Sequence, residues 1–178
     1  EYPGRVQAIW EVIQKYRFDP GVEFAVIRFE AAVNVATQED TNGDDIADRF
    51  GFVNDLPALL RALNQLQAAG GNTSYQAALA LAEATLAMDM SESSVDERAR
   101  SKYVIIFLSD GLPYPVNYNT GTNTPGSIVR AVREMMNLPK RFDVDDFTFH
   151  TAYLSTNTPM YVQEPAENLL RNMAAEGS

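Results

Sequence analysis

The sequence predicts an α/β fold in which a doubly wound, mainly parallel β-sheet carries helices on both faces. Apolar runs typical of strands alternate along the chain with segments whose apolar residues recur at helical spacing. Residues 103–108 are continuously apolar and rich in β-branched side chains, which is typical of a parallel strand buried on both faces. The chain has 178 residues, of which 46% are hydrophobic, and this is enough for one domain with a single core.

The first third of the chain predicts a helix and a β-hairpin. Apolar residues recur at helical spacing over residues 5–16, so this segment is expected to be an amphipathic helix. Residues 22–29 and 32–36 are two runs of strand-forming side chains and are expected to pair as a hairpin. Residues 38–50 are polar and rich in turn-forming side chains, and we interpret them as an inserted loop.

Two helices are expected on either side of the Gly70-Gly71 turn. The first begins at Asn54 or Asp55, either of which can cap it, and its leucines lie on one face: Leu56, Leu59, Leu60, Leu63 and Leu66. The buried side of the second helix carries another apolar set: Tyr75, Ala78, Leu79, Ala82 and Leu86. Residues 90–100 are expected to form a charged connection to the strand that follows.

The last third of the chain predicts a long loop followed by a helix, a strand and a final helix. The loop covers residues 112–126 and is rich in Pro, Asn, Thr and Gly, and loops of this length in compact domains are usually functional or disordered. A helix over residues 127–136 and a strand over residues 147–154 come next. The final helix is expected over residues 165–175, with Gly177 as its C-terminal cap.

The chain is expected to be one domain over residues 1–178 that is incomplete at both ends. It begins with a helix that has no strand before it and stops at a helix cap with no strand after it. A sheet of only about four strands would leave the helices without enough surface to cover. We therefore expect at least one strand before Glu1 and one after Ser178.

The composition argues against several classes of function. A formal net charge of −10 offers no basic surface for nucleic acid or for an anionic membrane. No apolar run approaches the roughly 20 residues that a membrane-spanning helix needs, so direct membrane insertion is not expected. There is no cysteine and only one histidine, His150, which we interpret as structural. Disulfides and thiolate metal sites are thereby excluded, and a histidine-based zinc site or catalytic dyad is disfavoured.

A carboxylate stands where a site is expected in such a fold, and a hydroxyl follows the glycine turn. Asp110 follows the apolar strand directly, in Ser109-Asp110-Gly111, and is either a turn former or part of a site. Ligands of parallel sheets bind beyond the carboxyl ends of the strands, which favours the site. Thr73 follows the Gly-Gly turn and can serve as a helix N-cap, a role that Ser74 could equally fill.

Three segments together resemble a von Willebrand factor type A domain: VEFAVIRFEAAVNVAT, LPALLRALNQLQAAGGNTSYQAALALAEATL and YVIIFLSDGLP. The resemblance covers roughly residues 1–177. It implies a metal-ion-dependent adhesion site at the top of the sheet, with Thr73 and Asp110 among the ligands of Mg²⁺ or Mn²⁺. Hard oxygen donors of this kind suit these ions. The ion would then bind a carboxylate that a protein partner presents, and the partner would stay intact.

The resemblance also implies a first ligand motif, Asp-x-Ser-x-Ser, that follows a buried strand. Its expected place would precede Glu1. Residues 89–93, DMSES, match the motif letter by letter but follow a helical run, so we interpret them as a flexible acidic connection at a helix end.

A second metal site is predicted within the inserted loop. Oxygen donors occupy loop positions 1, 3, 5 and 9, with a backbone carbonyl at position 7, as in EF-hand-type calcium loops: Asp40, Asn42, Asp44, Ile46 and Asp48. Asp45 and Gly51 depart from that pattern, and the segment is more similar to the short calcium loops of thrombospondin type 3 and dockerin repeats. The alternative is an acidic hairpin tip without a Ca²⁺ ion.

These features predict an extracellular or cell-surface adhesion or protein-interaction module that is not an enzyme. The expected partner contacts lie in the long loop beside the strand end: Tyr114, Asn117, Tyr118 and Asn119. One alternative is an intracellular scaffold or assembly subunit of the same family, for example with an AAA+ partner. A metal-assisted phosphotransferase using Asp110 is disfavoured, because the sequence shows no paired catalytic carboxylate, no Lys or Arg clamp and no phosphate-binding glycine loop.

Overall fold

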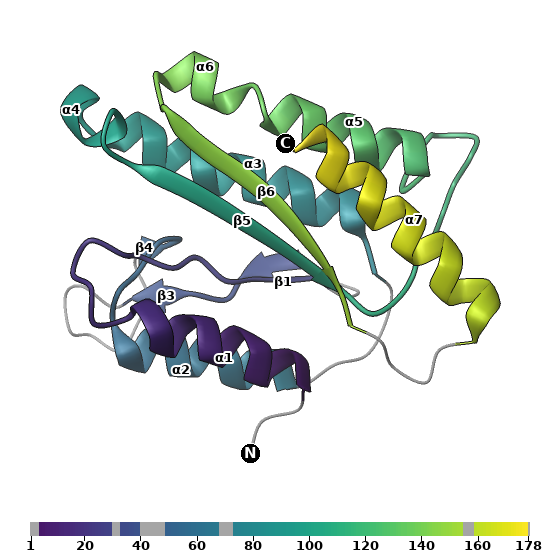
Figure 1. The fold of residues 1–178 in the computed structure, drawn as a ribbon, viewed down its shortest axis with the longest axis horizontal. Helices are drawn as coiled ribbons and strands as arrows, with labels where there is room; N and C mark the ends of the chain where they lie inside the picture. The colour runs from purple at the N-terminus through teal and green to yellow at the C-terminus, as the bar shows by residue number, and fades with distance from the viewer. Residues whose placement is uncertain (1–3, 30–32, 40–48, 68–72, 155–158, 178) are drawn as a thin grey trace. The chain divides into compact units, whose positions relative to one another are not determined.

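Helices and short strands follow one another along the whole chain, which makes the protein a mixed α/β structure (Figure 1). Its contacts divide it into two units, Glu1–Gly71 and Asn72–Ser178. The computed structural model describes the following residues: 4–29, 33–39, 49–67, 73–154 and 159–177.

The first unit combines two helices with two short antiparallel strand pairs within its described residues. In chain order its elements are α1 (Gly4–Tyr16), β1 (Ile27–Phe29), β2 (Val33–Val35), β3 (Gln38–Glu39), β4 (Arg49–Phe50) and α2 (Leu56–Gln67). Strand β1 pairs with β2, and β3 pairs with β4. The expected helix over residues 5–16 and the expected hairpin are therefore confirmed.

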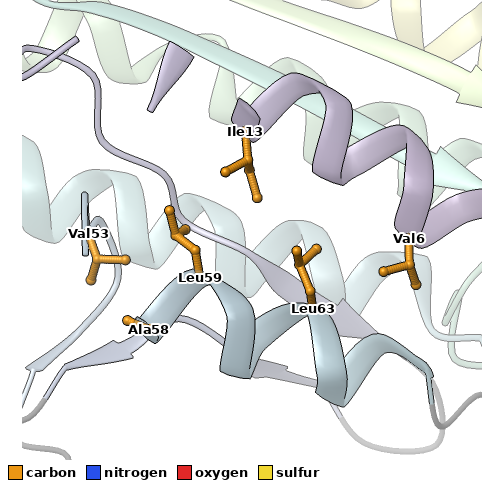
Figure 2. Close-up of a cluster of buried hydrophobic side chains, with 6 residues drawn as sticks. All are labelled: Val6, Ile13, Val53, Ala58, Leu59 and Leu63. Atoms are coloured by element: carbon orange, nitrogen blue, oxygen red, sulfur yellow. The ribbon is translucent and has the colours of Figure 1, made fainter. Parts of the chain in front are cut away.

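The core of this unit lies where α1 faces α2. Val6 and Ile13 are two helical turns apart on α1 and point toward Leu59 and Leu63, which are one turn apart on α2 (Figure 2). Each of these side chains is at most 1% exposed. The apolar residues whose 3.6-residue periodicity predicted the two helices are thus the residues through which the helices pack against each other.

Two expectations for this unit need refinement. The strand predicted over residues 22–29 is regular only from Ile27, and Phe24 forms an isolated antiparallel bridge with Val53 instead. The ends of the predicted loop over residues 38–50 pair as β3 and β4. Thr37 draws these ends together, because its fully buried hydroxyl donates to the Gly51 carbonyl at 2.6 Å and accepts from the Val26 amide at 3.1 Å.

The cap of α2 is Asp55, one of the two candidates. Its Oδ2 atom accepts a hydrogen bond from the Ala58 amide at 2.8 Å, which satisfies a backbone donor in the first turn of the helix. The side chain of Asn54 has another use, since its Nδ2 atom donates to the Asp19 carbonyl at 3.1 Å.

The second unit packs helices against a pair of parallel strands. In chain order its elements are α3 (Tyr75–Glu92), α4 (Val95–Arg98), β5 (Lys102–Ser109), α5 (Pro125–Met135), α6 (Leu138–Phe142), β6 (Asp146–Tyr153) and α7 (Met160–Glu176). Strand β5 pairs with β6 over its whole length, from Lys102 opposite Asp146 to Ser109 opposite Tyr153. This pair confirms a parallel sheet in the region where the sequence predicted one.

Helices cover one face of this strand pair. Phe107 packs edge-on against Tyr75 of α3, with ring centroids 4.8 Å apart, and the Thr151 hydroxyl donates to the Leu170 carbonyl of α7 at 3.1 Å. Val104 and Ile106 lie on the other face of the strand. Within the second unit the structure therefore shows helices packed against one side of the apolar run, and the expected burial of both faces stays a prediction.

Some helices begin or end at other residues than predicted, and short helices occur that the sequence did not predict. Residues 90–100 are not a plain connection: α3 continues to Glu92 with Met90 fully buried, and α4 follows behind a capping box formed by Ser94 and Glu97. Helix α6 was not expected. Helix α7 begins at Met160, so Pro165 lies inside it, although proline is more often found in a first turn.

Candidate functional site

Asp110 lies at the carboxyl edge of the parallel strand pair. It directly follows the last residue of β5, Ser109, whose partner in β6 is Tyr153, and its side chain is exposed. Within the described part of the chain, the Asp110 carboxylate has no hydrogen-bond or ion-pair partner. It is therefore available to a ligand at the edge where parallel sheets bind their ligands.

Thr73 immediately precedes α3 and does not cap it. The N-cap is Ser74, whose hydroxyl accepts a hydrogen bond from the Ala77 amide at 3.4 Å. The carbonyl of Thr73 accepts from the Tyr114 amide at 2.9 Å, which ties this segment to the loop after β5. Because Ser74 caps the helix, the Thr73 hydroxyl does not serve as the N-cap.

Tyr75 joins the Thr73 segment to the Asp110 segment. The fully buried Tyr75 hydroxyl oxygen lies 2.5 Å from the Ser109 hydroxyl and 2.6 Å from the Gly111 carbonyl, the residues on either side of Asp110. The two predicted ligands are thus brought to the same end of the strand pair by a side chain two residues from Thr73.

The Tyr75 hydroxyl stays neutral over the physiological pH range. Burial raises its pKa to about 12; the hydrogen bond with Ser109 opposes that rise and the nearby Asp110 carboxylate adds to it. Tyr75 therefore serves as a neutral hydrogen-bonding bridge rather than as a charged ligand.

The loop that follows Asp110 is organised by its own side chains. Residues 117 and 122 form an antiparallel bridge, and the Asn117 Oδ1 atom accepts hydrogen bonds from the amides of Asn119 and Thr120 at 3.0 and 3.2 Å. Tyr114 and Tyr118 are 63% and 79% exposed. Of the predicted partner contacts, Asn117 shapes the loop tip, and the two tyrosines are displayed on the surface.

Asn123 holds this loop and was not identified from the sequence. It is 1% exposed and has a positive φ of 53°. Its side chain joins Pro115 in the loop to Ser74 and Gln76 at the start of α3. The one available signal was an asparagine two residues before Pro125, since asparagine tolerates left-handed backbone better than most residues.

A second overlooked group is the hydroxyl of Tyr153 at the carboxyl end of β6. Its oxygen is buried and has no hydrogen-bond partner among the described residues. Buried hydroxyls normally have a partner, so this atom marks the strand end as a place where a further polar group can be accommodated.

The predicted calcium ligands Asp40, Asn42, Asp44, Ile46 and Asp48 lie outside the described residues. Only the flanks of that segment are described, as the antiparallel pair β3–β4. Within the described ranges no three side chains of the types His, Cys, Asp and Glu are grouped so that they could hold a metal ion.

The DMSES stretch is part of a helix end. Asp89 is in α3, and its Oδ2 atom accepts a hydrogen bond from the Tyr103 hydroxyl at 2.6 Å. The hydroxyls of Ser91 and Ser93 donate to carbonyls of the same helix, those of Met88 and Asp89. Its rejection as the first ligand motif is confirmed, although the segment is helical rather than a flexible connection.

His150 lies in the middle of β6 opposite Ile106, and its side chain is exposed. It is on the face of the strand pair that α3 and α7 do not cover. The histidine therefore does not form part of the packed core of the second unit.

None of the described helices combines the length and the apolar character that crossing a membrane requires. A scan against protein-family models and a search of curated proteins found no match to this chain. What the site can do chemically follows from its own residues.

Proposed function

We propose that this chain is a protein-interaction or adhesion module, similar to a von Willebrand factor type A domain, that binds a partner through a divalent ion beside Thr73 and Asp110. The observation that carries the proposal is the Tyr75 bridge. It links the residues flanking Asp110 to the segment of Thr73, although the two lie far apart in the sequence. The doubly wound sheet of that family is part of the same proposal.

The donors fit a hard cation. A carboxylate and a hydroxyl are oxygen ligands suited to Mg²⁺ or Mn²⁺, and the Asp110 carboxylate has no competing cation among the described residues. The remaining ligands would include the Asp-x-Ser-x-Ser motif that the resemblance implies, and the Tyr153 hydroxyl could hydrogen-bond a water molecule of the ion. Bound there, the ion would supply an open coordination position for a carboxylate of the partner.

The surface beside the site suits protein recognition. Tyr114 and Tyr118 offer rigid, amphipathic rings that bury much area at small cost in conformational entropy. The loop is already held in shape by Asn117, so less ordering is needed when a partner binds. An extracellular or cell-surface location belongs to this proposal, because adhesion through a shared ion operates there.

The test is metal binding by the full-length protein. Mn²⁺ should raise the melting temperature, because a ligand that binds only the folded state stabilises it by mass action. The variant Asp110→Ala should lose that rise, whereas Asp96→Ala, which removes an exposed carboxylate of α4, should keep it. An equal response to Mn²⁺ in wild type and Asp110→Ala would overturn the proposal.

A further inference from the structure

Asn123 is buried in a conformation that few residues adopt. Its φ of 53° lies in the left-handed region, and its side chain is 1% exposed. Asparagine is one of the few residues other than glycine that occupy this region at modest cost. A buried polar side chain in such a conformation needs several good hydrogen bonds to be stable.

The hydrogen bonds of Asn123 connect three separate backbone segments. Its Oδ1 atom accepts from the Gln76 amide at 3.1 Å and from the Ser74 hydroxyl at 3.3 Å. Its Nδ2 atom donates to the Pro115 carbonyl at 3.0 Å, and its backbone amide donates to the Gln76 Oε1 atom, also at 3.0 Å. Asn123, which lies near the end of the loop, is thereby hydrogen-bonded both to the start of α3 and to Pro115 near the beginning of the loop.

Thr73 lies inside this network. Ser74 and Gln76 follow it in the chain, and the Tyr114 amide holds its carbonyl at 2.9 Å. The backbone of Thr73 is thus fixed from two sides, and the loop that bears Tyr114 and Tyr118 is fixed by the same bonds.

We propose that Asn123 is a positioning residue of the site, which locks the Thr73 segment and the loop after Asp110 into one rigid arrangement. This inference rests on the proposed function for its metal-binding part. Groups that orient metal ligands without touching the ion typically change metal affinity by about 10–100-fold when they are replaced. A partner that engages the loop tyrosines would act on Thr73 through the same network.

Three variants separate this role from simple loop stability. Asn123→Gly keeps the positive φ without strain and deletes the side chain. Asn123→Asp keeps an acceptor for Ser74 and Gln76 and replaces the donor to the Pro115 carbonyl by a second acceptor oxygen. Thr120→Gly places a glycine at an exposed position of the same loop that is not among the expected partner contacts, and serves as the matched control.

The first measurement is amide hydrogen exchange of the full-length protein without metal. In Asn123→Gly the Tyr114 amide should exchange at least about tenfold faster, while the Phe107 amide within β5 keeps its wild-type rate. Thr120→Gly should leave both rates unchanged, and in Asn123→Asp the Tyr114 amide should also exchange faster than in wild type. Equal Tyr114 exchange in wild type and Asn123→Gly would overturn the positioning role, whatever the metal does.

The second measurement is calorimetric titration with Mn²⁺. Asn123→Gly should bind at least about tenfold more weakly than wild type, and Thr120→Gly should bind as wild type does. Faster Tyr114 exchange together with unchanged Mn²⁺ affinity would overturn the inference, since Asn123 would then hold only the loop. If wild type itself binds no Mn²⁺, the proposed function fails along with the metal part of this inference. The exchange data would still decide whether Asn123 fixes the Thr73 segment.

Discussion

At the scale of single residues, two tyrosine hydroxyls join β5 to α3, one near each end of the strand. Near the carboxyl end of β5 the Tyr75 hydroxyl reaches Ser109, and near its amino end the Tyr103 hydroxyl donates to Asp89 at 2.6 Å. Both tyrosines are buried, with exposed fractions of 0% and 7%. Buried hydroxyls in such positions fix the register of a helix against a strand, because no shifted arrangement would satisfy them.

Tyr103→Phe should lower the free energy of unfolding at pH 7 by about 1.5–3 kcal/mol, the usual range for a hydrogen bond to a charged group. The change removes only the hydroxyl that donates to the Asp89 carboxylate. Urea unfolding measures this decrease in the free energy of unfolding. Tyr118→Phe is the control, because that side chain is 79% exposed, and its effect should stay within about 0.5 kcal/mol. Equal effects of the two changes would contradict the prediction.

The stabilities of wild type and Tyr103→Phe should also differ in their dependence on pH. Burial, followed by the hydrogen bond to Asp89, raises the pKa of Tyr103 above its ordinary value of 10.0. Above pH 10 the unfolded chain therefore holds fewer protons at this residue than the folded one, and stability falls as pH rises. Tyr103→Phe lacks this contribution, so the stability difference between wild type and variant should shrink above pH 10. A constant difference would show that the two states share one pKa.

At the scale of elements, α7 ends in close contact with β6. Gly177 caps the helix, and a Cβ atom at this position would lie 2.5 Å from the Phe149 Cβ atom. The φ of Gly177 is −92°, which any residue adopts, so lack of space is the reason for the glycine. The neighbouring Glu176 receives two hydrogen bonds from Arg133 of α5, at 2.6 and 2.8 Å. The end of α7 is therefore held against both a strand and a helix.

Gly177→Ala should destabilise the protein by about 1–3 kcal/mol, the usual cost of forcing an extra methyl group into a packed site. Chemical denaturation measures it. The matched control is Gly126→Ala in the first turn of α5, where a Cβ atom would meet nothing within 4 Å. That change should be neutral or stabilise by about 0.4–1 kcal/mol. Equal stability of Gly177→Ala and wild type would mean that α7 can move away from β6 without loss.

At the scale of the whole molecule, the two predicted metal sites belong to different units. The loop over residues 40–48 is in the first unit, and Thr73 and Asp110 are in the second. The formal net charge of −10 favours cations near either site, although charge alone does not make a site.

Calcium binding to the loop should be independent of Asp110. Four aspartates and an asparagine occur within nine residues there, and Ca²⁺ accepts irregular ligand geometry better than Mg²⁺ does. Calorimetry should find a Ca²⁺ binding event that persists in Asp110→Ala and is lost in the double variant Asp40→Ala, Asp44→Ala. If the double variant binds Ca²⁺ as the parent does, the loop is only an acidic turn.

The sequence by itself determined the order of the helices and strands, because apolar periodicity and turn chemistry are local properties. Residues 5–16, the hairpin, the parallel strand run and the cap at Gly177 all follow from neighbours within a few positions. It also placed Asp110 at a strand end. Boundaries were less certain where two local signals compete: Met90 continues α3 because it is buried, and Pro165 lies inside α7 despite its usual preference for a helix start.

Only the tertiary structure decided which distant groups meet. The Tyr75 bridge to Ser109 and Gly111 and the network of Asn123 join residues that are separated along the chain. Such contacts depend on how a helix packs against a strand, which no local pattern encodes.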